Sequence, residues 1–288
     1  MARFVKATTT TTGGLVAAQS TRAAAAGGEV LRAGGNAVDA AVATSLALGV
    51  CEPWMSGIGG GCAAVIRPAG GDAVTVDGGM LAPAALDPAR YPLTGGGAGA
   101  GFFAWPEVVG DRNVTGPLAV ATPGLVAALG KAHAHFGRLP WREVVAPAIA
   151  VAEAGHEVDW YTALVVTTGA AALRDQPAAA AHFLPDGLPP SPDWRKGTVT
   201  LDTSALARTY RQLAEHGAGS FYAGPLAERW LAEARAAGTW LTAEDLAGYA
   251  ARLLPPRRFT YRGARFAVMD GLFAGVSLEH ALGVVADA

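Results

Sequence analysis

A helix stop is followed at once by a helix start in the stretch GGNAVDAAVAT, residues 34–44. The preceding residues 16–32 carry small side chains on one face and predict a helix, which the glycine pair ends because glycine adopts the left-handed conformation at little steric cost. Asn36 then begins an alanine-rich helix that stops at Glu52, since the residue before a proline avoids the α region. Two helices with small, closely packing surfaces are therefore expected.

A β-hairpin is predicted next. Residues 62–67 and 73–77 are rich in small and branched side chains, and residues 68–72 form the turn between them. Before the hairpin, the glycines of residues 56–61 permit close packing of the backbone. After it, residues 91–101 contain five glycines and predict a flexible surface loop.

The region of about residues 124–250 predicts a helical block. Helices are expected over residues 125–136, 140–154, 203–216 and 225–237, and a capping box opens a short helix at Thr242. Strands are expected over residues 259–261 and 265–269, returning to a sheet, before a last helix from residue 278. Strands at both ends with helices between them indicate a layered α+β fold in one region, residues 1–288.

The composition disfavours several classes of partner. The 288 residues are 51% hydrophobic and 16% charged, with a net charge of −2 and no basic run, so no nucleic acid is expected as a partner. The longest apolar helix, residues 37–50, carries Asp39 and is too short to cross a bilayer, so no membrane partner is expected. Residues 8–12 are threonines and no apolar leader is present, so a cytoplasmic location is expected.

Isolated reactive side chains give no catalytic pattern. The two cysteines occupy apolar positions and are expected to be small buried residues, because a disulfide requires the glycine-rich segment between them to fold back. His133 and His135 stand two apart on a predicted helix, where their side chains diverge, so solvated histidines are expected. Ser56 lacks the G-x-S-x-G nucleophile elbow. Neither a metal nor a cofactor is predicted.

Several short motifs occur together in one order. They are the GGNAVDAAVAT stretch with the glycine run after it, APA at residues 82–84, VATPG at 120–124, FYAG at 221–224, LTAEDL at 241–246 and YRG at 261–263. From about residue 13 to the C-terminus, the chain thus resembles the large-subunit half of the γ-glutamyltransferases, the N-terminal-nucleophile hydrolases that cut γ-glutamyl amides. Each motif is weak alone, and their shared order carries the resemblance.

The resemblance implies a fold and a mechanism. The family fold is a four-layer αββα sandwich built by two subunits, to which this chain is expected to supply outer helices, edge strands and the helical block. The family nucleophile is a threonine freed by self-cleavage, whose hydroxyl attacks the γ-glutamyl carbonyl while its own amine takes the proton. A small-subunit-like catalytic chain or C-terminal region is therefore the implied partner. No catalytic residue is assigned in residues 1–288, and the chain alone is expected to be inactive.

One substrate contact of the family falls within this chain and departs from the family pattern. The implied substrate is glutathione or another γ-glutamyl amide, whose α-carboxylate is held by an arginine shortly before an Ala-Pro pair. Here the run is VDGGMLAP, residues 76–83, and Gly79 takes the arginine position. Losing a charge-assisted contact of ~1.5–3 kcal/mol is expected to weaken γ-glutamyl binding by about one to two orders of magnitude. Asp77 is a candidate to orient the substrate amine or to cap a turn, and Arg112 is a candidate replacement for the guanidinium.

Three functional interpretations follow from these patterns. The first is hydrolysis or transfer of γ-glutamyl amides after assembly with the threonine-bearing partner. The second is an acylase or amidohydrolase whose acyl group lacks the carboxylate, as Gly79 indicates, or a silent relative without catalysis. The third, a nucleotide-binding module, is disfavoured because the glycines of residues 91–101 do not connect a strand to a helix. A companion polypeptide that begins with threonine distinguishes the enzyme from the silent relative.

Overall fold

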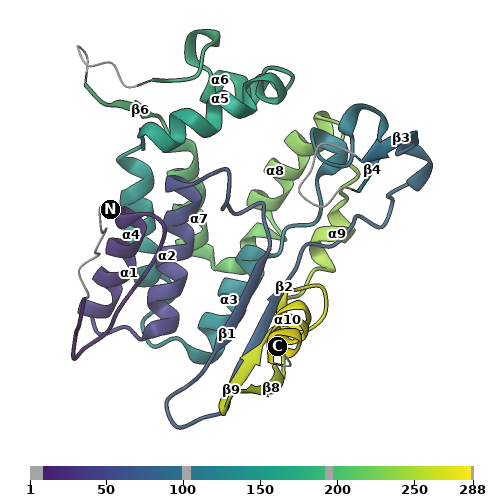
Figure 1. Ribbon diagram of the computed structural model, residues 1–288. Helices are drawn as coiled ribbons and strands as arrows, with labels where there is room; N and C mark the ends of the chain where they lie inside the picture. Colours follow the sequence, from purple (N-terminus) through teal and green to yellow (C-terminus); the bar gives the residue numbers. More distant parts are fainter. Residues whose placement is uncertain (1–8, 99–104, 192–196, 287–288) are drawn as a thin grey trace, which may run out of the picture.

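The computed structural model describes residues 9–98, 105–191 and 197–286 (Figure 1). A group of helices lies beside a small antiparallel sheet. Helices α5 (Trp160–Arg174) and α6 (Pro177–Phe183) lie at one end of the molecule, and strands β8 (Arg257–Tyr261) and β9 (Ala264–Val268) lie at the other.

The first two helices follow the sequence prediction closely. Helix α1 (Thr21–Arg32) begins later than predicted because Ser20 caps it, its side chain accepting a hydrogen bond from the Ala23 N–H. Gly34 after it has φ 94°, the left-handed conformation that glycine permits. Helix α2 (Ala37–Cys51) begins at Asn36 in a capping box with Asp39, so the predicted start is confirmed.

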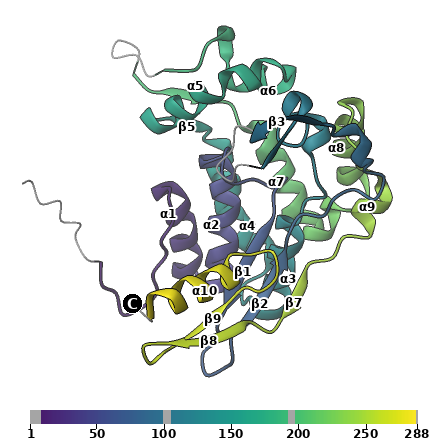
Figure 2. The same cartoon turned by 45° about the vertical axis from the view of Figure 1, so that its right-hand side comes forward.

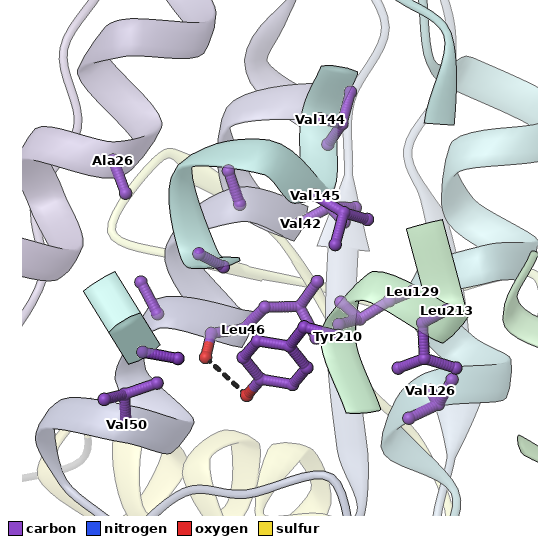
Figure 3. Close-up of a cluster of buried hydrophobic side chains, with 14 of the residues drawn as sticks. Ala26, Val42, Leu46, Val50, Val126, Leu129, Val144, Val145, Tyr210 and Leu213 are labelled. Atoms are coloured by element: carbon purple, nitrogen blue, oxygen red, sulfur yellow. Dashed lines mark hydrogen bonds between the residues drawn. The ribbon is translucent and has the colours of Figure 1, made fainter. Parts of the chain in front are cut away.

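Helix α2 is the centre of the main hydrophobic core. It packs against α1 and α4 (Trp141–Glu153). Helix α7 (Ser204–His216) packs on α4 and reaches α2 through the fully buried Tyr210. The Tyr210 hydroxyl donates a hydrogen bond of 2.7 Å to the Leu46 carbonyl, drawn in Figure 3. The fully buried Tyr210 hydroxyl therefore has a hydrogen-bond partner, which avoids the cost of burying an unpaired polar group. The mostly small side chains of α2 let the neighbouring helices approach closely.

The main sheet has three antiparallel strands, in the order β1 (Cys62–Ile66), β2 (Val74–Gly78) and β7 (Arg252–Leu254). The predicted hairpin is confirmed by the pairing of β1 with β2. One face of the sheet packs on helix α3 (Leu125–Phe136) through a small core that includes Val76. On the opposite face Val65 is 46% exposed, whereas its cross-strand partner Thr75 is buried, so this face is partly covered.

Two predictions about strands are corrected. Part of the predicted loop at residues 91–101 is strand β3 (Leu93–Ala98), which pairs with β4 (Pro106–Val108). The segment is a strand because it pairs with β4, which a glycine-rich composition does not predict. Residues 99–101 of the predicted loop lie outside the described residues. Strands β8 and β9 pair with each other in a separate two-stranded sheet, and the strand that returns to the first sheet is the unpredicted β7.

The remaining elements complete the two ends and the flank. Strand β5 (His156–Val158) pairs with β6 (Val199–Leu201), and helix α10 (Gly275–Ala286) packs beside β8, as Figure 2 shows. Helices α8 (Pro225–Ala236) and α9 (Ala243–Ala247) follow α7, with the predicted capping box at Thr242. The short 3₁₀ helices are Pro88–Arg90, Val109–Asp111, Pro117–Ala119, Pro185–Gly187 and Ala218–Phe221.

Within the described ranges, every helix is too short or too polar to pass through a bilayer. Cys51 and Cys62 are free thiols and both are partly buried, so no disulfide joins them. Burial raises the pKa of the Cys62 thiol to about 11, which keeps it protonated and unreactive at neutral pH.

Candidate active-site cleft

The glycine-rich segment, residues 56–61, connects α2 to β1 and is fixed to the start of α3. The Gly60 carbonyl accepts hydrogen bonds of 2.9 Å from the N–H groups of both Gly124 and Leu125. These N–H groups stand at the beginning of a helix, where they have no partner within the helix. The segment therefore serves as a cap for α3 and is held in one position.

Glycines also allow the sheet and α3 to touch through their backbones. A Cβ atom on Gly124 would lie 2.0 Å from the Gly78 carbonyl oxygen and 2.3 Å from the Tyr249 hydroxyl. A Cβ atom on Gly61 would lie 3.2 Å from the same Gly78 oxygen, whereas one on Gly59 would meet nothing within 4 Å. The predicted close packing of the glycine run is thus confirmed at Gly61, and Gly59 borders open space.

A cleft of about 500 Å³ opens between this segment, α2 and the end of β2. Its rim includes Met55 and Met80, whose side chains are 75% and 55% exposed. Ser45 and Ser56 contribute hydroxyls, and no charged side chain is present in the part of the lining that the structure describes. The cleft suits an apolar or neutral group, held by methionine side chains that adapt to irregular shapes.

Asp77 and Gly79 meet at the end of β2, beside the cleft. The Gly79 N–H donates a hydrogen bond of 2.9 Å to Oδ1 of Asp77, and the other carboxylate oxygen pairs with the guanidinium of Arg252 on β7. Burial raises the pKa of Asp77, but this N–H and the guanidinium outweigh it, and the net pKa lies below its usual range. Asp77 is therefore an ionised carboxylate that caps the turn.

Two tyrosines hold Gly79 against α3. The Tyr249 hydroxyl donates to the Gly79 carbonyl at 2.7 Å, and its ring stacks on Tyr222 with the ring centres 5.5 Å apart. The Tyr222 hydroxyl donates to the Pro123 carbonyl at 2.9 Å and accepts from the Ala127 N–H at 3.1 Å. Burial is the largest cause of the raised pKa of both phenols, so both remain protonated donors.

A side chain at position 79 would enter a defined space. The Cβ direction of Gly79 passes 3.2 Å from Oδ1 of Asp77 and 3.6 Å from Cζ of Phe273. A carboxylate thus lies on one side of the space and an aromatic ring on the other. Any longer side chain here would stand beside the Asp77–Arg252 pair.

The structure brings two of the three sequence-predicted binding residues together. Asp77 and Gly79 are hydrogen-bonded, whereas the Arg112 guanidinium donates to the Arg90 carbonyl at 3.5 Å, and no contact within the described residues joins it to either of them. Arg252 was missed by sequence reasoning. Its three-residue strand has no hydrophobic alternation long enough to predict it, so nothing placed Arg252 opposite Asp77.

Both histidines of the pair were predicted to be solvated, and the prediction is wrong for His133. His135 is exposed, but the His133 side chain is only 15% exposed; its Nε2 lies 2.8 Å from the Leu139 carbonyl and 3.6 Å from Oδ1 of Asp39. The helix turns this face toward the α3–α4 connection, which the spacing alone did not indicate. Across the described ranges, no three histidine, cysteine or acidic side chains gather as they do around a metal ion.

Comparison with known proteins gives one consistent relationship. The family model described as Gamma-glutamyltranspeptidase matches residues 23–288. The chain is 37% identical over 235 residues to the acylase ACY 1 proenzyme of Pseudomonas sp. (strain SE83), covering 82% of this chain and 40% of that protein. It is 34% identical over 236 residues to the glutathione hydrolase proenzyme of Escherichia coli (strain K12), covering 82% and 38%. It thus spans about two fifths of the length of these curated relatives.

The fold agrees with this relationship. The structure superposes on the γ-glutamyltranspeptidase of Helicobacter pylori with a TM-score of 0.87 at 29% sequence identity, covering 98% of this chain and 77% of the other. The α+β fold predicted through the resemblance is thereby confirmed.

Proposed function

Because the chain belongs to the γ-glutamyltranspeptidase family, we propose that it forms part of an amide hydrolase or acyltransferase. The match across residues 23–288 carries this proposal. Both curated relatives described above are proenzymes, which supports a product that is processed into parts. In the proposed enzyme a small-subunit-like region supplies the threonine nucleophile, and this chain supplies one wall of the substrate site.

In the proposed reaction the residues of this chain position the substrate and do not take part in bond making or breaking. The Gly60 carbonyl and the backbone around Gly79 are fixed by hydrogen bonds to Leu125 and Tyr249, so the cleft is preorganised before substrate binds. Preorganisation lowers the cost of placing the scissile amide near a nucleophile. Met55 and Met80 offer apolar contacts to the acyl group.

An acyl amide without a carboxylate is the second candidate substrate, and Gly79 favours it. The uncharged cleft lining and the Phe273 ring beside position 79 both suit a neutral acyl group. The 37% identity to an acylase proenzyme, beside 34% to a glutathione hydrolase proenzyme, supports considering both substrates.

A γ-glutamyl substrate requires a guanidinium from elsewhere, and Arg252 offers one. Its side chain is 67% exposed and is paired only with Asp77 in the described residues. Arg112 remains the alternative predicted from the sequence.

The test is expression of the complete gene product that contains this chain. We expect processing into two polypeptides, the second beginning with threonine, and turnover of γ-glutamyl-p-nitroanilide, butyryl-p-nitroanilide or both. Alanine in place of that threonine serves as the control and should abolish processing and turnover. A complete, folded product that is neither processed nor active on either anilide would overturn the proposal.

A further inference from the structure

A second cavity of about 630 Å³ lies between the C-terminal end of α2 and the N-terminal end of α5. It is lined on the α5 side by Trp160 and Tyr161, and on the α2 side by Trp54. Its volume falls in the range of small-molecule sites. None of these residues lines the cleft described above.

Aromatic rings form a continuous wall of this cavity. Trp160 contacts Tyr161 with ring centres 5.6 Å apart, Tyr161 contacts Trp54 at 5.9 Å, and Trp54 contacts the buried His156 at 5.7 Å, all close to edge-to-face. Trp160 is 74% exposed, so its ring is accessible to a ligand in the cavity.

The charged groups of the lining are mainly acidic. Glu52, Glu157 and Asp159 face a single cation, Arg22, which gives a net charge of −2. The Arg22 guanidinium is already engaged, since it donates to the carbonyls of Gly155 at 2.9 Å and Val151 at 3.2 Å. It therefore cannot turn toward the carboxylates without losing these bonds.

The two carboxylates nearest the aromatic wall are held differently. Asp159 caps α5, accepting from the Thr162 N–H at 2.7 Å. Glu52 has no hydrogen-bond or ion-pair partner within the part of the chain that the structure describes. Burial, and then the like charge of Asp159, raise the pKa of Glu52. A positive group placed beside both carboxylates offsets their mutual repulsion.

The buried histidine does not supply that charge. Nδ1 of His156 lies 2.8 Å from the Val50 carbonyl and must carry a proton to donate to it, while Nε2 lies 3.3 Å from the Thr162 hydroxyl. Burial lowers the pKa of His156, so the ring is neutral at neutral pH. The cavity thus combines aromatic faces with unneutralised carboxylates.

We propose that this cavity binds a small organic cation with a primary ammonium group. The ammonium donates to Glu52 and Asp159, and its alkyl part lies against Trp54 and Trp160. The aromatic rings offer apolar contact to the alkyl part, and hydrogen bonds to charged groups are stronger than neutral ones. The proposal is independent of the proposed amidase function, because it concerns a separate cavity.

Binding to the full 288-residue chain tests the proposal. The probe is n-butylammonium, measured by titration calorimetry and tryptophan fluorescence, with n-butanol and butyrate as neutral and anionic analogues of equal length. We expect binding of the cation only. Equal heats and equal fluorescence changes for butylammonium and butanol would overturn the proposal.

Variants locate the site. Glu52→Gln should weaken butylammonium binding about 10-fold or more, and Trp160→Ala about 2- to 5-fold. Glu228→Gln is the matched control, because it removes one negative charge from the exposed surface of α8 outside the cavity. Trp160 is exposed, so its variant should keep the melting temperature of the parent. Equal affinities for Glu52→Gln and Glu228→Gln, both folded, would refute the assignment.

Discussion

Asp39 shows how much structure one side chain can organise. Its carboxylate is fully buried and accepts N–H groups from Asn36 at 2.9 Å, Arg138 at 3.0 and 3.1 Å, and Leu139 at 3.2 Å. It therefore joins the start of α2 to the connection between α3 and α4. The sequence suggested only that a charged residue interrupts an apolar helix, because the N–H groups of Arg138 and Leu139 lie about a hundred residues away.

We expect Asp39→Ala to destabilise the chain by ~3 kcal/mol or more, because several buried donors lose their acceptor at ~1–3 kcal/mol each. Urea denaturation of the 288-residue chain gives the change as a shift in the midpoint. Asp72→Ala is the control, since that side chain is 93% exposed. Similar midpoints for the two variants would contradict the assigned role of Asp39.

Position 79 gives a prediction about substrate choice in the complete enzyme. Gly79→Arg adds a guanidinium beside the Asp77–Arg252 pair and should lower KM for a γ-glutamyl anilide about 10-fold, with little effect on a neutral acyl anilide. If Arg252 or Arg112 already binds the carboxylate, Arg252→Gln or Arg112→Ala should instead raise KM for the charged substrate alone. Equal effects on both substrates would remove the carboxylate argument.

The ionisation of Asp77 gives a prediction about pH. Its pKa is lowered in the folded chain, so its contribution to stability is present above the usual pKa of 3.8 and is lost as the pH falls through the lower folded value. Arg252→Gln should raise the pKa of Asp77, measured by carboxyl NMR titration. Arg258→Gln, which removes the partner of Asp72, should leave it unchanged. An unchanged Asp77 titration in Arg252→Gln would show that the guanidinium does not act on it.

At the scale of elements, the contact between α3 and β2 depends on glycine. Gly124→Ala places a methyl group 2.0 Å from the Gly78 carbonyl oxygen, so the helix must move away from the strand. We expect a loss of ~1–3 kcal/mol from this overpacking, measured by thermal or urea denaturation. Gly59→Ala has nothing within 4 Å of the added methyl and should have almost no effect. A stable Gly124→Ala chain would mean that the contact is not tight.

Local signals predicted those elements that have caps and periodic patterns. Asn36, Thr242 and the glycine pair marked helix ends correctly because caps act within a few residues. Strand β7 and the Asp77–Arg252 contact were missed, since they join positions far apart in the chain. Helices α5 and α6 were also not predicted. The close packing of the glycine run was predicted, but the cleft beside it and its charge-free lining required the structure.

At the scale of the whole molecule, the helical core is complete while one face of the sheet is only partly covered. Val65 and Leu254 are 46% and 36% exposed on that side. A separate prediction concerns activity. The 288-residue chain alone should show no hydrolysis of γ-glutamyl-p-nitroanilide, because no nucleophilic threonine is assigned in it. A homogeneous preparation of 288 residues that turns the anilide over, at a rate above a heat-denatured control, would contradict this prediction.

The shared Gly60 carbonyl restricts how this protein can diversify. Because that oxygen accepts two N–H groups and Gly61 packs closely on the Gly78 carbonyl, substitutions that move this backbone should be poorly tolerated. Met55 and Met80 contact the same cleft through exposed side chains and carry no comparable constraint. New acyl preferences should arise by replacing these two residues, and a combinatorial library at positions 55 and 80 is the shortest route to altered specificity.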